Sequence, residues 1–426
     1  MPPRRSARLV ALANPHFQLP FPPNVVALLF SVLPLDARLR AREVCRGWRF
    51  FLEDFSFWQS LDFSAAAAER LTVALTWGLV RAACARATGT LHTLKLQGRR
   101  EVPFAALEEL VAENGESLRS LMMPTTLILD AADVGRLRQA APLCELSCNV
   151  QCEGAEAVAL MRCELVCPFF LTVKNLDTEQ LQTDFASTLA THTGIKGLLL
   201  LGGNLADAVL NLSLAVVAAG VESIGFGHCG LTPMALPALT LLLRSEVLHC
   251  FILSNHGVLL TGPDLLAFCD ALRSNSSLYH IMLNNGNLWA DPADAGMVLA
   301  ALAARTTPFT LGLDGNRVGE TQAQQLAAGT QLAQLITAGG LEELNLNDCN
   351  LGEAGLVPIF ETLPRASRLM CLAFGGDELS PEFARDVLLP AVRANNSLRS
   401  LNFRYEDEGE LLPELIEAQN IVEARN

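Results

Sequence analysis

The hydrophobic pattern of most of this chain is one short phrase that returns many times. From residue 91 onward, apolar residues stand at the first, fourth and sixth positions of a six-residue segment that recurs every 25 to 33 residues. Positions four and six point to the same side of an extended backbone, so each copy predicts a short strand with one buried face. The copies begin at Leu91, Leu118, Leu143, Pro168, Ile195, Val221, Leu248, Leu278, Pro308, Leu341, Leu369 and Leu398, and the one at Pro168 is the poorest.

A helix is predicted after most of these strands. In residues 352–363, for example, apolar residues recur at helical spacing, which predicts a helix that covers the other side of the core. One strand–helix unit cannot bury its apolar face alone, whereas stacked units share a continuous core. The period and the phrase resemble the leucine-rich repeat, and the longer later units resemble its ribonuclease-inhibitor-like class. The resemblance implies an α/β, curved solenoid of about twelve repeats over residues 61–426, with a parallel sheet on its concave face, helices on its convex face and a C-terminal helical cap.

The ninth position of the repeat departs from this family in several copies. The family usually has Asn or Cys there, and its side chain bonds the backbone of the turn. This chain has such residues at Cys229, Asn316 and Cys349. Other copies carry Gln151, Gly203, His256 or Asp377. The departures predict an irregular curvature.

The segment before the repeats is rich in aromatic residues. Residues 44–58 hold six of the 26 aromatic residues of the chain. The repeat frame continues into this segment, because Trp58, Leu61 and Phe63 fill its first, fourth and sixth positions. Upstream, residues 24–33 predict a helix that prolines flank on both sides. About 40 residues are normally too few for an independent core, so their apolar surface must be covered by the repeats, by a partner or by both.

Residues 19–58 resemble the F-box. The resemblance rests on Leu-Pro at residues 19–20, Phe-Ser-x-Leu-Pro at 30–34, Asp36, Val-Cys-Arg-x-Trp at 44–48 and the distal Trp58. Ala37 and Leu39 depart from the Asp-Leu pair that the family usually has. The resemblance implies a small all-α F-box over residues 17–60. Residues 1–16 are basic and lack an apolar stretch of signal-peptide length, so we expect a disordered lead-in, with a nuclear-import patch or a weak transit peptide as the alternatives. The F-box resemblance also implies contacts with a Skp adaptor, and thereby with a cullin, through Leu19, Pro20, Val25, Leu29, Phe30, Leu33, Pro34 and Trp48.

The whole chain therefore resembles an F-box and leucine-rich-repeat protein. This resemblance implies a substrate-recognition subunit of a Skp–cullin–F-box ubiquitin ligase, whose repeats bind a protein substrate and which is not itself an enzyme. Two other interpretations stay open. One is an F-box and repeat scaffold without a role in degradation, and the other is a repeat regulator such as a GTPase activator or an enzyme inhibitor.

Composition narrows the classes of partner. The net charge is −14 and no basic stripe is present, which argues against a nucleic-acid partner. No apolar run is long enough to span a bilayer, so no membrane is expected. Twelve cysteines in 426 residues are too dilute for a disulfide scaffold, which favours a reducing compartment, the cytoplasm or the nucleus. The glycosylation sequons at Asn211, Asn275 and Asn395 are then chance matches.

Two sequence patterns suggest a cofactor or a metal, and the repeat frame explains both. Gly225, Gly227 and Gly230 spell a dinucleotide-binding fingerprint, but they fall at positions five, seven and ten of an ordinary repeat. The cysteines of residues 144–167 suggest a zinc or iron–sulfur site. The frame places Cys148 inward and Cys144 outward, so we interpret these cysteines as small hydrophobic residues. No cofactor and no metal are expected.

The repeat frame also predicts where a substrate binds. The fifth and seventh positions point away from the core, and the fifth position is apolar or bare in five consecutive copies: Leu199, Gly225, Ile252, Met282 and Gly312. Polar groups rim this row, and an apolar patch with a polar rim is typical of an interaction surface. The alternative is that the C-terminal residues 410–424 or a second copy of the chain covers the row. The predicted substrate-binding residues are Leu199, Ile252, His280, Met282, Asn284, Asp314, Asn345 and Asn347.

Overall fold

The computed structural model describes most of the repeat region. The described residues are 59–63, 77–87, 89–96, 102–124, 126–163, 166–257, 259–338, 340–376, 379–404 and 412–425. The residues expected to bind the adaptor, from Leu19 to Trp48, lie outside this set, as does Trp58.

The chain divides into two compact units, which are described separately. The first unit contains the described residues up to Gln151 together with the described part of Cys163–Phe169. Its elements are β1 (Ser60–Asp62), α6 (Trp77–Ala87), β2 (Thr93–Lys95), α7 (Phe104–Asn114), β3 (Ser120–Met122), β4 (Ile128–Leu129), α8 (Ala131–Ala140) and β5 (Glu145–Glu153). Within it β1, β2, β3 and β5 pair in chain order and in parallel, and β4 also pairs with β5.

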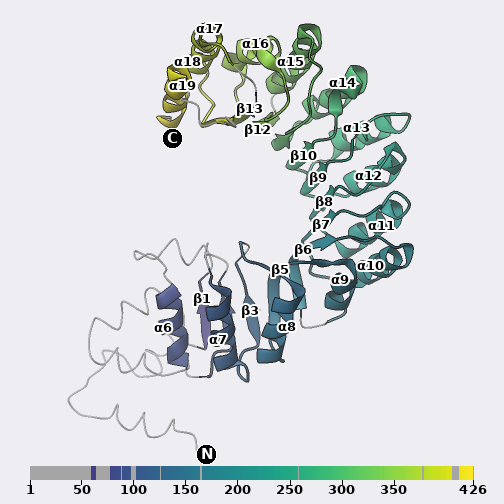
Figure 1. Ribbon diagram of the computed structural model, residues 1–426, viewed down its shortest axis with the longest axis vertical. Coiled ribbons are helices and arrows are strands. Elements are labelled where there is room, and N and C mark those ends of the chain that lie inside the picture. The colour runs from purple at the N-terminus through teal and green to yellow at the C-terminus, as the bar shows by residue number, and fades with distance from the viewer. Residues whose placement is uncertain are drawn as a thin grey trace, which may run out of the picture. The chain divides into compact units, whose positions relative to one another are not determined.

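The second unit contains Cys152–Arg162 and the described residues from Phe170 onward. Its strands are β6 (Val166–Lys174, from Phe170), β7 (Gly197–Leu201), β8 (Ser223–Gly227), β9 (Cys250–Ser254), β10 (His280–Asn284), β11 (Phe309–Gly312), β12 (Leu341–Asn345), β13 (Cys371–Gly375) and β14 (Ser400–Arg404). They pair in chain order, and every pairing described is parallel. Figure 1 shows this unit as an arc with the strands on its inner, concave side.

Helices form the outer side of that arc (Figure 1). They are α9 (Gly154–Met161), α10 (Glu179–Thr191), α11 (Val209–Ala219), α12 (Leu236–Leu243), α13 (Leu265–Ser274), α14 (Pro292–Ala303), α15 (Gln322–Thr337), α16 (Gly352–Thr362), α17 (Pro381–Phe383), α18 (Leu389–Ala394) and α19 (Pro413–Glu423). Short 3-10 turns are η2 (Pro233–Ala235), η3 (Leu288–Ala290) and η4 (Leu363–Arg365), and η5 (Ala384–Leu388) is a π-helical turn.

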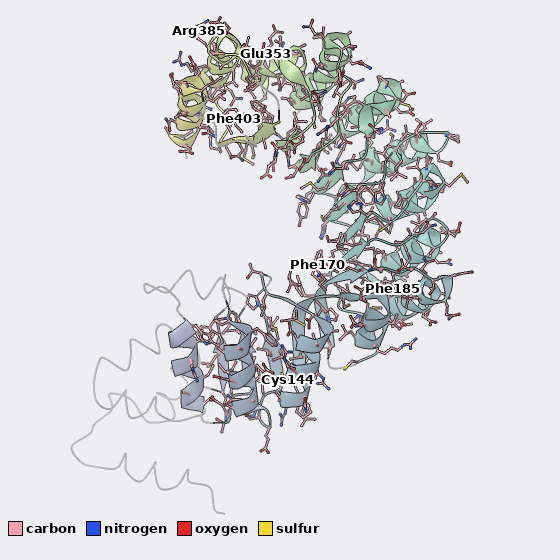
Figure 2. The ribbon with its side chains drawn as sticks, in the orientation of Figure 1. Cys144, Phe170, Phe185, Glu353, Arg385 and Phe403 are labelled. Atoms are coloured by element: carbon pink, nitrogen blue, oxygen red, sulfur yellow. The ribbon has the colours of Figure 1, made fainter. Side chains whose placement is uncertain are left out.

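The expected α/β repeat solenoid is confirmed. A strand lies on each of the twelve predicted copies, and β1 lies on the copy that contains Leu61. The fourth position of each copy is at most 4% exposed, as a buried strand face requires: Leu94, Leu121, Leu146, Leu171, Leu198, Ile224, Phe251, Ile281, Leu311, Leu344, Leu372 and Leu401. Phe185 of α10, labelled in Figure 2, is fully buried and shows how the helices complete the same core.

From β6 to β13 the chain turns out of each strand through a left-handed residue at position eight. Between β6 and β13 these residues have φ between 50° and 83°: Asn175, Gly202, His228, Asn255, Asn285, Gly315, Asp348 and Gly376. Glycine, Asn and Asp tolerate this conformation better than other residues, which explains the composition of that position. The turn then aims the ninth residue back under the sheet.

Ninth-position side chains bond the backbone of the neighbouring repeat, as predicted for Cys229, Asn316 and Cys349. The Cys229 thiol donates to Leu200 O at 3.2 Å, and the Cys349 thiol donates to Leu313 O at 3.2 Å. The Asn316 amide donates to Leu283 O at 2.6 Å. His256 stands where the family usually has Asn or Cys, and it also bonds the neighbouring repeat, because its Nε2 lies 2.8 Å from Phe226 O.

Acid is expected to destabilise the second unit in part through His256. Burial lowers the pKa of its imidazole below the usual 6.5, although the Phe226 carbonyl opposes the shift. The unfolded chain therefore takes up a proton near pH 6.5 that the folded chain resists, so stability is complete above that pH and declines below it, by at most about 1.4 kcal/mol per pH unit.

His256→Asn introduces at this ninth position the residue type that Asn316 has in its own repeat. The variant should lose less stability than the natural chain as the pH falls. Denaturant titrations between pH 7.5 and 5 check it. Burial also lowers the pKa of His192 and His280, but both residues are present in the natural chain and in the variant. The difference between the two stability profiles therefore reports on His256. Parallel profiles for the two chains would contradict the assignment.

Three buried polar residues occupy one further repeat position, three residues before a copy begins. Asn275 donates to Leu243 O at 2.7 Å, and its Oδ1 accepts from Leu278 N at 2.7 Å. Asn395 repeats this arrangement, with a bond to Leu363 O and one from Leu398 N. These bonds bury two of the three sequon asparagines, which are 7% and 0% exposed, so neither amide is accessible to glycosylation in the folded chain.

Arg305 stands in this position in the copy at Pro308. Its guanidinium donates to Leu272 O and Leu278 O. The side chain is among the largest that are fully buried, and its Cζ lies 5.4 Å from the centre of the Phe309 ring. The reason for an arginine is local: Pro308 has no N–H, so an asparagine here would lose the donor that Leu278 and Leu398 supply. Burial lowers the pKa of Arg305 to about 10, so it stays charged at neutral pH.

Candidate partner-binding face

The concave face of the second unit carries the predicted substrate-binding row. Strand register aligns the fifth positions across nine neighbouring strands: Thr172, Leu199, Gly225, Ile252, Met282, Gly312, Asn345, Ala373 and Asn402. The alternation of the strands turns these side chains away from the helices. The five consecutive residues read from the sequence are therefore real neighbours in space.

The middle of the row is apolar and has two bare positions. Leu199, Ile252 and Met282 are half-buried, and the two glycines between and beside them are buried although they have no side chain. A Cβ at Gly225 would lie 2.5 Å from Leu199 Cδ1, and one at Gly312 would lie 2.1 Å from Met282 Sδ. The neighbouring side chains thus lean over the glycines and fill the space.

Phe170 extends the apolar surface and was missed by the sequence analysis. It stands at the third position of the copy that begins at Pro168, within β6. Its ring lies over Gly197, where a Cβ would be only 2.1 Å from Phe170 Cδ2. Figure 2 labels it at the start of the second unit. The signal was available, because the third position shares the exposed strand face with the fifth. The poor match of the copy at Pro168 concealed it.

The predicted polar residues lie around Gly312 and are brought together by β10, β11 and β12. Met282 pairs with Gly312 and Gly312 with Asn345, while His280 pairs with Thr310 and Thr310 with Glu343. Beyond them the seventh positions of the same three strands are Asn284, Asp314 and Asn347, all half-buried. Glu343, which was not predicted, is exposed at the same face.

Charges on the face are unevenly distributed. Beside β7 to β9, Lys196 Nζ lies 2.5 Å from Glu222 Oε1, and Glu222 Oε2 lies 3.8 Å from His249 Nδ1, so the charges are compensated there. At β11 and β12 the charged side chains on the face are the carboxylates of Asp314 and Glu343. Burial lowers the pKa of His280, although Glu343 opposes the shift, so His280 adds no positive charge at neutral pH.

The C-terminal helix does not cover the row. α19 packs on α18 and β14 at the end of the arc (Figure 1), where Arg393 forms an ion pair with Glu417 at 2.5 Å. Gln419 donates to Leu401 O of β14 at 3.2 Å, and Leu415, Ala418 and Val422 are buried. The described part of the C-terminal segment therefore leaves Leu199, Ile252 and Met282 open.

Of the cysteines in residues 144–167, Cys144, Cys148 and Cys152 are buried, whereas Cys163 and Cys167 are half-buried, and the prediction for Cys144 needs a correction. Cys144, predicted to face outward, is 0% exposed, whereas Leu143 is 59% exposed. The turn that begins with the bond from Cys144 N to Ala141 O shifts the buried position by one residue. Burial raises the pKa of Cys144, Cys148 and Cys152 to about 12, which keeps them protonated. The described residues contain no group of three or more His, Cys, Asp or Glu that could hold a metal ion.

Neighbouring side chains cover two glycines of the dinucleotide fingerprint. Gly225 and Gly227 both belong to β8, and Leu199 and Leu201 of the next strand lie over them. Gly230 has a positive φ in the turn that follows. Of the helices described, none has the length and apolar content needed to cross a bilayer.

Comparisons with known proteins add little. No family model matches the chain, and no curated protein matches it. Among solved structures, leiomodin-1 actin-binding site 2 is similar at 17% identity, over 38% of this chain and 70% of that chain, with a TM-score of 0.21. A likeness at that TM-score carries no argument about the function of this chain.

Proposed function

We propose that this chain is a substrate-recognition subunit of a Skp–cullin–F-box ubiquitin ligase. Its F-box-like residues 17–60 dock on the Skp adaptor, and its repeats bind the protein to be ubiquitinated. The chain does no bond chemistry itself. It acts by proximity, because tethering raises the effective concentration of substrate lysines near the conjugating enzyme to about the millimolar range.

The observation that carries the proposal is an open face on the repeats of a chain whose sequence also resembles the F-box. The F-box resemblance rests on many positions that agree at once between Leu19 and Trp58. It is followed by a repeat unit whose concave face presents half-buried apolar residues in an open row. A receptor needs both, one surface for the ligase and one for the substrate.

Adaptor binding is the first test. Leu33→Asp should weaken capture of the chain by the Skp adaptor at least about 30-fold, since an anchor lost from a desolvated interface centre costs about 2 kcal/mol or more. Leu19→Ala with Pro20→Ala should act in the same direction. Co-purification of the two proteins, followed by titration, measures the loss.

Leu210→Asp is the matched control, because Leu210 is 51% exposed on α11 and the chemical change is the same. It should leave adaptor capture unaltered. Full capture of the Leu33→Asp chain would overturn the F-box assignment and favour a plain repeat regulator. Where the adaptor binds, deletion of the chain from cells separates a receptor, whose substrates accumulate, from a scaffold, whose partners do not.

A further inference from the structure

The face of β10, β11 and β12 has the form of a three-by-three grid with a glycine at its centre. Its rows run across the three strands and are His280, Thr310 and Glu343, then Met282, Gly312 and Asn345, then Asn284, Asp314 and Asn347. We call these nine residues the Gly312 grid. Neighbouring strands are about 4.8 Å apart, so the outer residues enclose an area of the size of one side-chain end.

The centre of the Gly312 grid can open. Gly312 has no side chain, and the atom over it is the Met282 thioether, 2.1 Å from where a Cβ would stand. A methionine side chain has several rotatable bonds and moves aside at little cost. A partner side chain that displaces it reaches the backbone of β11, with Asp314 on one side and Glu343 on the other.

The polar groups of the Gly312 grid are rich in hydrogen-bond acceptors. Asp314 and Glu343 carry carboxylates. The amide oxygens Oδ1 of Asn284 and Asn347 are buried and have no hydrogen-bond partner among the described residues. A buried acceptor without a donor is unfavourable by about 1–3 kcal/mol, and a donor brought by a ligand removes that penalty. These two amide oxygens therefore lack donors.

The charge of the surroundings selects a cation. No ion pair of Glu343 is described, and burial keeps the neighbouring His280 neutral, so negative charge dominates the grid. The chain as a whole has a net charge of −14, which attracts basic partners over longer range. Two carboxylates beside amide oxygens match the donors of a guanidinium or an ammonium group.

We propose that the concave face binds a basic segment of its protein partner, with an arginine or lysine side chain in the Gly312 grid and an aliphatic side chain on Leu199, Ile252 and Met282. The inference rests on the proposed function, because it names the class of substrate segment that the repeats select. The partner is a protein segment whose face-directed side chains are apolar over β7 to β10 and basic over β11 and β12.

A synthetic peptide tests the inference on the full-length chain. The probe is a fluorescein-labelled dodecapeptide in which serine alternates with isoleucine in one half and with arginine in the other, so that both kinds of side chain face the same way. Binding is measured at about 150 mM salt, where exposed charges farther apart than about 8 Å are screened. Peptides with citrulline or glutamate in place of arginine are its uncharged and acidic counterparts. Fluorescence anisotropy should show binding of the arginine peptide, with at least about tenfold weaker binding of the other two.

Two kinds of variant test whether the arginine peptide binds at the Gly312 grid. Asp314→Asn with Glu343→Gln should weaken the arginine peptide at least about tenfold, whereas Glu361→Gln with Glu423→Gln, which removes two exposed carboxylates elsewhere, should change it less than about twofold. Gly312→Leu fills the grid without altering charge and should weaken binding at least about tenfold as well. Melting curves on each variant verify that it is folded.

The outcomes separate this inference from the proposed function. No binding of the arginine peptide to the natural chain, or equal weakening by both pairs of carboxylate variants, overturns the basic-segment inference. Adaptor capture is measured on the same preparations. If the peptide behaves as expected but the adaptor is not captured, the ligase role fails, while the face remains a binding site for basic segments.

Discussion

Arg305→Ala is expected to lower the free energy of unfolding of the second unit by about 3–5 kcal/mol, because two buried acceptors lose their donor at about 1–3 kcal/mol each and a large buried side chain is removed. The change leaves the carbonyls of Leu272 and Leu278 without their donor and opens a cavity beside Phe309. Denaturant unfolding, with hydrogen exchange on α13 and α14 as the local measurement, gives the size of the effect.

A double-mutant cycle tests the reason for the arginine. Arg305→Asn alone should also be destabilising, since Pro308 offers no N–H to the asparagine. Adding Pro308→Leu restores the arrangement seen at Asn275 and Leu278, so the double variant should recover more than about 1 kcal/mol. Additive losses in the two changes would show that proline and arginine are not coupled.

Gly329→Ala is expected to lower the free energy of unfolding of the second unit, because α15 has no room for a methyl group there. A Cβ at Gly329 would stand 1.9 Å from Gly355 O and 2.8 Å from Gly355 Cα, both backbone atoms of α16 that no side-chain rotation can move. The two helices must separate, and overpacking of this kind costs about 1–3 kcal/mol or more. Hydrogen exchange on α15 and α16 should show the loss locally.

Gly135→Ala is the matched control because Gly135 also lies inside a helix, α8, and nothing stands within 4 Å of its would-be Cβ. There the same methyl group should raise stability by about 0.5–1 kcal/mol through helix propensity. If Gly329→Ala were as benign as Gly135→Ala, the close contact between α15 and α16 would not exist in solution.

The neighbours within the concave row could be predicted from the sequence, for a simple physical reason. In a parallel repeat array the strands have the same register, so residues with the same position in the phrase become neighbours. Leu199, Ile252 and Met282 could therefore be brought together from spacing alone. Glu343 and Phe170 stand at the third position of their copies, which shares that face, and the sequence prediction used this position only at His280.

The sequence by itself determined the repeat: the period, the buried fourth and sixth positions and the strand placement follow from alternation that each segment carries within itself. It did not determine contacts that join neighbouring repeats at irregular points. Cys144 is buried because a turn moves the buried first position of its copy by one residue. Arg305 is buried because it bonds the carbonyls of Leu272 and Leu278 in the preceding repeat, and Gly329 is required because α16 approaches it at Gly355. Each depends on atoms from two segments at once, and only the tertiary structure places those atoms together.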